Sequence, residues 1–137
     1  MKKKSDPRHH QRLNTVKALF EGAFRENYKP AKNSQAEKVV SSLGKIDRVI
    51  LKNAPAWPIS QIAPVDLAVL RLAIWELLCE EKGTPYKVIA DEAVEIAKEF
   101  GNESSPKFIN GVLGSIISKK LHERAKPDTV RYLAQRD

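Results

Sequence analysis

The side chains best suited to catalysis are few and scattered in this sequence of 137 residues. It contains three histidines, His9, His10 and His122, and one cysteine, Cys79. Nucleophilic catalysis needs a base beside a nucleophile, and a metal site needs several ligands at suitable spacing. Adjacent His9 and His10 point to different faces of a helix, and Cys79 stands alone. The sequence therefore predicts no enzyme, no metal site and no cofactor.

Phosphate-binding loops are also missing from the sequence. Neither GxGxxG nor GxxxxGK[ST], the glycine-rich patterns that cradle phosphates, occurs in it. Gly111 and Gly114 form a bare GxxG, but RNA-clamping loops of that type carry exposed residues at their centre. Here Val112 and Leu113 stand between the glycines inside an apolar helical pattern. We therefore expect the two glycines to allow close helix packing.

Positive charge is the strongest chemical signal, and it lies at the two ends of the chain. Of the net charge of +7, residues 1–12 contribute +4 and residues 119–137 contribute +3, so residues 13–118 are neutral. A basic flank on a neutral body is typical of a surface that binds phosphate groups. Solvated, disordered tails explain the same pattern equally well, and the charge alone does not decide between them.

Composition predicts one small domain in a reducing compartment. Apolar residues make up 42% of the chain, enough for a single core. One cysteine cannot form a disulfide framework, no signal peptide is visible, and no apolar run reaches the roughly 18 residues of a membrane span. We expect a cytoplasmic protein without membrane contact.

Apolar residues recur at helical spacing throughout, and no strand is predicted. Start and stop signals predict five helices, over residues 8–26, 34–53, 64–81, 84–101 and 105–124. The third is apolar nearly all round and should be the buried centre, so Glu76 within it must find a partner or reach the surface. Trp57, between prolines, is expected to fill the seam between two halves. The cluster of Asp91, Glu92 and Glu95 favours a solvated helix face over a salt-bridged one.

Three stretches together resemble one family. Residues 65–77 (VDLAVLRLAIWEL), 84–98 (TPYKVIADEAVEIAK) and 105–113 (SPKFINGVL) resemble, in order and spacing, the signature helices of the NusB family of transcription antitermination factors. The resemblance covers about residues 57–118 and is highly specific. Residues 16–20 (VKALF) match the family more loosely.

The resemblance implies an all-α helical bundle of about five to six helices in two small subdomains, residues 8–53 and 54–124. Residues 1–7 and 126–137 would be basic, flexible ends. It further implies a transcription antitermination factor, not an enzyme. Such a factor binds the single-stranded boxA RNA of nascent rRNA leaders with NusE, a small-subunit ribosomal protein, within an RNA polymerase antitermination complex. Family members can be monomers or dimers, so a homodimer stays open.

The resemblance also assigns site residues. Its RNA-binding residues would be Lys2, Lys3, Lys4, Arg8, His9, His10, Arg12, Lys107 and Phe108. Phe108 would stack on an unpaired base, although an equal alternative makes it a core residue. The residues facing the partner would be Asp66, Val69 and Trp75.

Two departures from the family pattern keep alternatives open. Only two arginines remain at the start of the first helix, and the connection before residue 34 is too short for a helix that many members have there. The chain could instead be a NusB-like RNA-binding fragment of an rRNA methyltransferase, which needs a large cofactor-binding domain. It could also be an oligomeric scaffold with weakened RNA binding.

Overall fold

The computed structural model describes residues 6–54, 58–80 and 82–124, and in these it consists of helices without a strand. The bounds are α1 (Pro7–Gly22), α2 (Gln35–Ser41), α3 (Leu43–Asn53), a short 3-10 helix η1 (Ile59–Gln61), α4 (Pro64–Leu78), α5 (Tyr86–Phe100) and α6 (Ser105–Arg124). The predicted all-α fold is confirmed. The division into two subdomains remains a prediction, and Trp57 and the predicted C-terminal tail lie outside the described residues.

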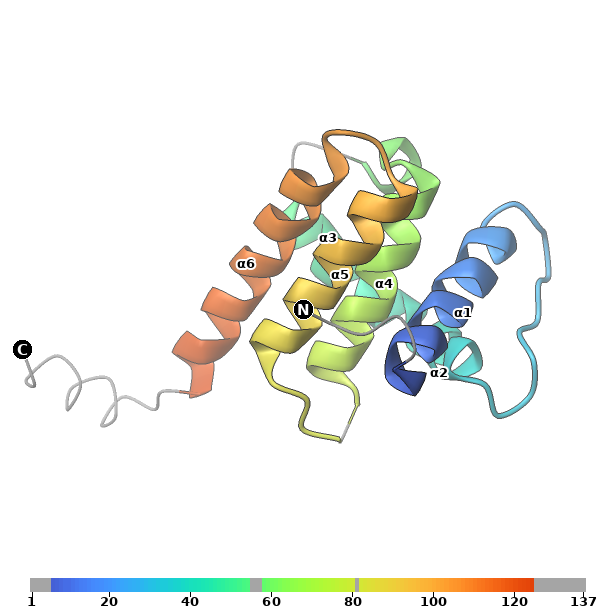
Figure 1. Cartoon of the computed structure of the whole chain (residues 1–137), viewed down its shortest axis with the longest axis horizontal. Helices are drawn as coiled ribbons and strands as arrows, with labels where there is room; N and C mark the ends of the chain where they lie inside the picture. The colour runs from blue at the N-terminus through green and yellow to red at the C-terminus, as the bar shows by residue number, and fades with distance from the viewer. Residues whose placement is uncertain (1–5, 55–57, 81, 125–137) are drawn as a thin grey trace, which may run out of the picture.

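Helices α4, α5 and α6 run alternately up and down beside one another and form the body of the molecule (Figure 1). Helix α3 crosses behind this layer and contacts α4 and α6, while α1 packs along α4 and α2 contacts both α1 and α4. Helix α4 therefore touches every other α-helix in the described part of the chain. This arrangement matches its sequence, which is apolar nearly all round.

Local capping explains where the N-terminal helices begin. Asp6 caps α1, because its side chain accepts a hydrogen bond from the backbone N–H of Arg8 at 2.9 Å. Ser34 caps α2 by accepting from the N–H of Glu37 at 3.1 Å, and the Glu37 carboxylate accepts from the N–H of Asn33 at 2.9 Å. This reciprocal pair is close to the capping box that the sequence predicts.

The predicted single helix over residues 34–53 is wrong, because the structure divides it into α2 and α3 at Ser42. The backbone of Ser42 leaves the helical region, with φ −111° and ψ 16°. Serine side chains compete with the helix through local hydrogen bonds, and Gly44 follows closely. The helix propensity of the sequence is therefore low around Ser42. Both pieces still bury their apolar faces, since Val39, Ile46 and Ile50 are fully buried.

Polar contacts fix α3 against its neighbours. Arg71 on α4 donates two hydrogen bonds to Asp47 on α3, from Nε to Oδ1 at 3.0 Å and from Nη2 to Oδ2 at 2.9 Å. The Ser115 hydroxyl on α6 donates to Oδ1 of Asn53 at the end of α3 at 2.7 Å. These contacts set the position of α3, while the apolar core provides most of the stabilisation. The fully buried core includes Val39, Ile46, Ile50, Leu70, Ile74, Ala97, Ile109 and Leu113.

The glycines of the GxxG pattern do not pack closely against another helix, so that prediction is wrong. Gly111 and Gly114 are exposed, and a Cβ built on either one meets no heavy atom within 4 Å. Two other glycines are tightly packed, Gly22 against the Tyr28 ring and Gly101 where α5 ends, against Ser105 and Ala97. A Cβ on Gly101 would lie 2.5 Å from the Ser105 hydroxyl and 2.8 Å from the Ala97 carbonyl oxygen.

We expect Gly101→Ala to lower the free energy of unfolding by about 1–3 kcal/mol, because the added methyl group overpacks a closed site. Gly111→Ala is the matched control, and it should raise stability by about 0.5–1 kcal/mol because alanine favours an open helix position. Urea denaturation of both variants measures the difference. Equal effects of the two substitutions would contradict the packing described.

Candidate nucleic-acid interface

A buried cluster of charges ties the first helix to the body of the molecule. The guanidinium group of Arg12 on α1 bonds Glu76 on α4, from Nη2 to Oε1 at 2.7 Å and from Nε to Oε2 at 3.0 Å. Its Nη1 also donates to Oε1 of Glu92 on α5 at 3.2 Å. All three residues are buried, and Arg12 is only 7% exposed. Glu76 has thus found the partner that its place in an apolar helix requires.

The electrostatics of this cluster keep Arg12 charged. Burial by itself would lower the pKa of Arg12, but the hydrogen bond and the charge of Glu76 raise the pKa above its ordinary value. The charges of Glu92 and Glu80 act in the same direction. A buried guanidinium group that is fully engaged with carboxylates has little to offer a phosphate group. The structure therefore gives Arg12 a structural role, whereas we expected a direct RNA contact.

The other predicted residues at the start of α1 differ in exposure. Arg8 is exposed and pairs with Asp6 at 3.3 Å, and His10 is also exposed. His9 is largely covered, and its Nδ1 lies 3.3 Å from Oε2 of Glu92. The sequence favoured a solvated face for Glu92, and this prediction is wrong. The salt-bridged alternative is the right one for this residue. Lys2, Lys3 and Lys4 lie outside the described residues.

A second group of predicted residues meets at a pocket of about 330 Å³ where α4 and α6 begin. Asp66 on α4 and Phe108 on α6 both line it, together with Gln61, Asn102 and Ser104. Asp66 is 5% exposed, and its Oδ1 has no hydrogen-bond partner among the described residues. Phe108 packs against the core on one side and lines the pocket on the other, and the adjacent Lys107 is exposed.

The two groups of predicted RNA-binding residues lie at opposite ends of α4. Arg12 reaches Glu76 near the C-terminal end of α4, whereas the Asp66–Phe108 pocket lies at its N-terminal end. A helix of 15 residues is about 22 Å long, so one side chain cannot serve both ends. An RNA strand that touched both groups would have to follow the length of the molecule.

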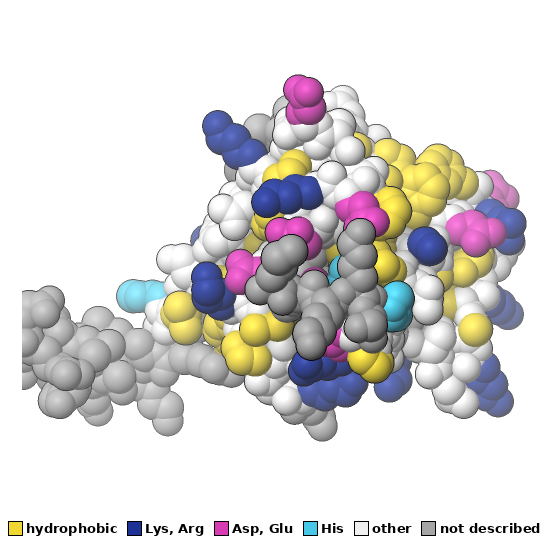
Figure 2. All heavy atoms as spheres, viewed as in Figure 1, with side chains coloured by type: hydrophobic (Ala, Val, Ile, Leu, Met, Phe, Trp, Pro, Cys, Tyr) yellow, Lys and Arg dark blue, Asp and Glu magenta, His cyan; other side chains and the backbone are white. Residues whose placement is uncertain are grey.

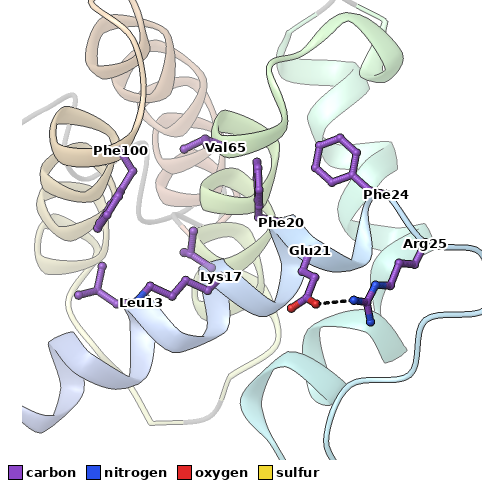
Figure 3. A pocket seen from close by; sticks show the side chains of 9 residues that line it. Leu13, Lys17, Phe20, Glu21, Phe24, Arg25, Val65 and Phe100 are labelled. Atoms are coloured by element: carbon purple, nitrogen blue, oxygen red, sulfur yellow. Dashed lines mark ion pairs between the residues drawn. The ribbon is translucent and has the colours of Figure 1, made fainter.

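The predicted partner-facing residues are buried. Val69 is 2% and Trp75 7% exposed, and both belong to the core together with their neighbours on α4. Phe20 and Phe100 belong to the apolar stripes of their helices, yet they are 38% and 45% exposed. These two rings line an apolar groove of about 520 Å³ between α1, α4 and α5 (Figure 3).

Apolar side chains line the groove, and an ion pair lies at its opening. Leu13, Val16 and Val65 form apolar walls, and Phe24 extends the aromatic surface, with its ring edge-to-face against Phe20 at 5.1 Å between centroids. In Figure 3, Glu21 and Arg25 form an ion pair at one side of the opening, with a distance of 2.8 Å. The spacing of Phe20 and Phe24, four residues apart on one helix, is the sequence signal that could have found this surface.

Within the described part of the chain, no three histidine, cysteine or acidic residues come together as a metal site would require. None of the described helices is both long and apolar enough to cross a membrane.

Solved structures place this architecture in a known class. The chain superposes on NusB of T. maritima with a TM-score of 0.68 and 36% identity, over 85% of this chain and 92% of that one. A chain in the crystal structure of a plectonemic RNA supercoil has a TM-score of 0.70 at 22% identity, and it shares the fold. The fold is thus a NusB-type all-α fold.

Sequence comparisons name the family. The NusB family model matches residues 1–118, and the chain belongs to the NusB family. The transcription antitermination protein NusB of Chloroflexus aggregans is 51% identical over 80 residues, which are 58% of this chain and 53% of that protein. The protein of the same name from Alkaliphilus oremlandii is 37% identical over 102 residues, covering 74% of this chain and 73% of that protein. The matched segment spans about half the length of the first relatives.

We expect Arg12→Ala to lower the free energy of unfolding by about 3–5 kcal/mol, because it leaves Glu76 and Glu92 buried without their cation. Arg8→Ala is the control, since its exposed ion pair with Asp6 should contribute no more than about 1 kcal/mol. Urea denaturation at pH 7 compares the two variants. Losses of similar size would show that the buried cluster does not hold α1 in place.

Glu80, after the end of α4, gives a prediction about pH. Burial raises the pKa of Glu80, and the charge of Glu76 adds to the rise. A carboxyl group whose pKa is higher in the folded than in the unfolded state makes its full contribution to folding stability below its unfolded pKa, about 4.3. That contribution is lost as the pH rises through the folded pKa. Glu80→Gln should therefore have a higher urea midpoint than the wild type at pH 7 but not below about pH 4. Glu99→Gln, at an exposed position on α5, is the control. If Glu80→Gln raised the urea midpoint equally at both pH values, the expectation would be contradicted.

Proposed function

We propose that this protein is a transcription antitermination factor that binds the boxA RNA of nascent rRNA leaders together with NusE. The pocket formed by Asp66 and Phe108 is the observation that carries the proposal. Family membership and the antitermination function in the names of the relatives support it. In this proposal the protein acts within an RNA polymerase antitermination complex and performs no reaction of its own.

The chemistry of the Asp66–Phe108 pocket suits an unpaired base. The half-buried ring of Phe108 offers a face for stacking, as aromatic residues do in proteins that bind single-stranded RNA. A buried carboxylate oxygen without a hydrogen bond is costly unless a ligand supplies a donor. Oδ1 of Asp66 is such an atom, and the amino groups of bases are donors. Exposed Lys107 beside Phe108 can contact a neighbouring phosphate group.

Near the C-terminal end of α4, where α1 begins, Arg8 and His10 are exposed and suit phosphate contacts. In the proposal, Lys2, Lys3 and Lys4 complete this basic group. His9 and Arg12 support it from within, because both are tied to Glu92 and so fix the start of α1.

We further propose that NusE docks in the apolar groove of Phe20, Phe24 and Phe100. Monomeric proteins rarely expose contiguous apolar surface of this kind, and interfaces are rich in aromatic side chains. The groove adjoins the base pocket, because Val65 lines the groove and the next residue, Asp66, lines the pocket. A protein in the groove and a base in the pocket would thus be neighbours, which explains why RNA and NusE would bind jointly. Of the residues that the resemblance assigned to the partner, Val69 lies one turn after Val65 and would support this surface, and Asp66 borders it. Trp75 lies toward the other end of α4 and lines a different pocket.

Titration of boxA RNA and of a scrambled RNA, with and without NusE, tests the proposal. We expect tighter binding of boxA RNA when NusE is present. Phe108→Leu, which keeps an apolar side chain but removes the aromatic face, should weaken boxA binding by about 1–3 kcal/mol, roughly 5- to 150-fold. Its urea midpoint serves as the control for the role of Phe108 in the core.

Two outcomes would overturn parts of the proposal. Equal, weak binding of both RNAs with NusE present would exclude specific recognition of boxA. A Phe20→Ser/Phe24→Ser variant that still bound NusE normally would exclude the groove. The same variant also tests the homodimer, because self-association through the groove would appear as a concentration-dependent mass of the wild type that the variant lacks.

A further inference from the structure

A second pocket of about 450 Å³ lies at the end of the molecule where α1 and α2 begin and α4 ends. Gln11 comes from α1, Gln35 and Lys38 come from α2, and Cys79 comes from the end of α4. Trp75 contributes the small exposed part of its ring to the wall. None of these residues was assigned to this site by sequence reasoning, and the pocket lies at the other end of α4 from Phe108.

The polar groups of this pocket are largely uncommitted. Neither the side-chain amide of Gln11 nor the ammonium groups of Lys38 and Lys82 have a hydrogen bond or ion pair to another described residue. Gln35 accepts a hydrogen bond from the Thr15 hydroxyl at its Oε1, at 2.8 Å, which leaves its amide N–H₂ group available. Amide groups can donate and accept at once, so they match the edges of bases, whereas ammonium groups match phosphate oxygens.

The charges in the pocket favour a phosphate-bearing ligand. Lys38 and Lys82 both act on the carboxyl group of Glu80, which also lines the pocket, so the three groups lie close together. Two cations and one carboxylate give the lining of the pocket a net positive charge. The carboxylate of Glu80 can accept a hydrogen bond from an exocyclic amino group of a base.

We propose that this pocket is a second subsite for single-stranded RNA, in which Lys38 and Lys82 bind the backbone phosphates and the amides and Glu80 contact a base. This inference rests on the proposed RNA-binding function and extends it. The subsite continues the basic start of α1, because Arg8 lies one helical turn before Gln11. Figure 2 shows Lys and Arg side chains gathered at the lower edge of the molecule, where α1 begins and α4 ends.

Cys79 provides a direct probe, because it is the one cysteine of the chain and it lines the pocket. The rate of Cys79 alkylation by iodoacetamide is measured in the full chain with increasing boxA RNA, with and without NusE. We expect saturating RNA to slow alkylation severalfold. Phe108→Leu should need more RNA for this effect but should reach the same protection, since it alters only the distant pocket.

The salt dependence of RNA affinity tests the lysines independently of the thiol. Lys38→Ala/Lys82→Ala should bind RNA more weakly and lower the slope of log K against log salt by about 1.4, since each phosphate contact of single-stranded RNA contributes about 0.7. Lys45→Ala/Lys52→Ala, with the same charge change at exposed positions on α3, is the matched control and should leave the slope nearly unchanged.

The outcomes separate this inference from the proposed function. If RNA bound normally but left both Cys79 alkylation and the slope of the Lys38→Ala/Lys82→Ala variant unchanged, the subsite would be excluded and the proposed function would stand. If neither boxA RNA nor scrambled RNA bound in any arm, both would be excluded. The subsite would be established if RNA protected Cys79 from alkylation and the salt slope fell in the Lys38→Ala/Lys82→Ala variant but not in the Lys45→Ala/Lys52→Ala control.

Discussion

The pairing of Arg12 with Glu76 and Glu92 is the interaction on which the arrangement of this molecule depends. It joins α1, α4 and α5 at one buried point, and a guanidinium group with carboxylates on two helices permits few relative orientations. Replacing such a cluster by apolar residues need not cost stability, so its value here lies in orientation. By fixing α1 along α4, it presents the basic start of α1 at one end and opens the apolar groove at the other.

Sequence reasoning predicted most of the fold because helical periodicity and capping are local properties. The all-α class, the central position of α4 and the capped start of α2 all follow from residues close together in the chain. The break at Ser42 was missed because the apolar spacing continues across it, and only tertiary packing decides between one helix and two. The exposure of Phe20 and Phe100 was missed for a related reason, since periodicity shows which face is apolar but not whether another element covers it.

The candidate site was predicted in part, and the errors have one physical cause. Asp66 was selected as a partner-facing residue and Phe108 as an RNA-binding residue, and the structure brings them to one pocket although 42 positions separate them. Arg12 was assigned to RNA through the family resemblance, yet its partner Glu76 lies 64 residues away. A sequence shows that Glu76 needs a partner, but it does not show which cation supplies it. Pairing across such distances is set by the fold, so buried and exposed arginines look alike in the sequence.

The separation of the two polar ends along α4 has a consequence for affinity. A strand held at one end of a rigid helix meets the other end at a high effective concentration, so two weak subsites can act as one stronger site. This gain requires that the distance between them stay fixed, and the buried Arg12 cluster together with the packed core around α4 provides that rigidity. In the proposed function, the basic start of α1 would attract the strand at one end of α4. The groove beside the base pocket at the other end is apolar and would be left to a protein partner.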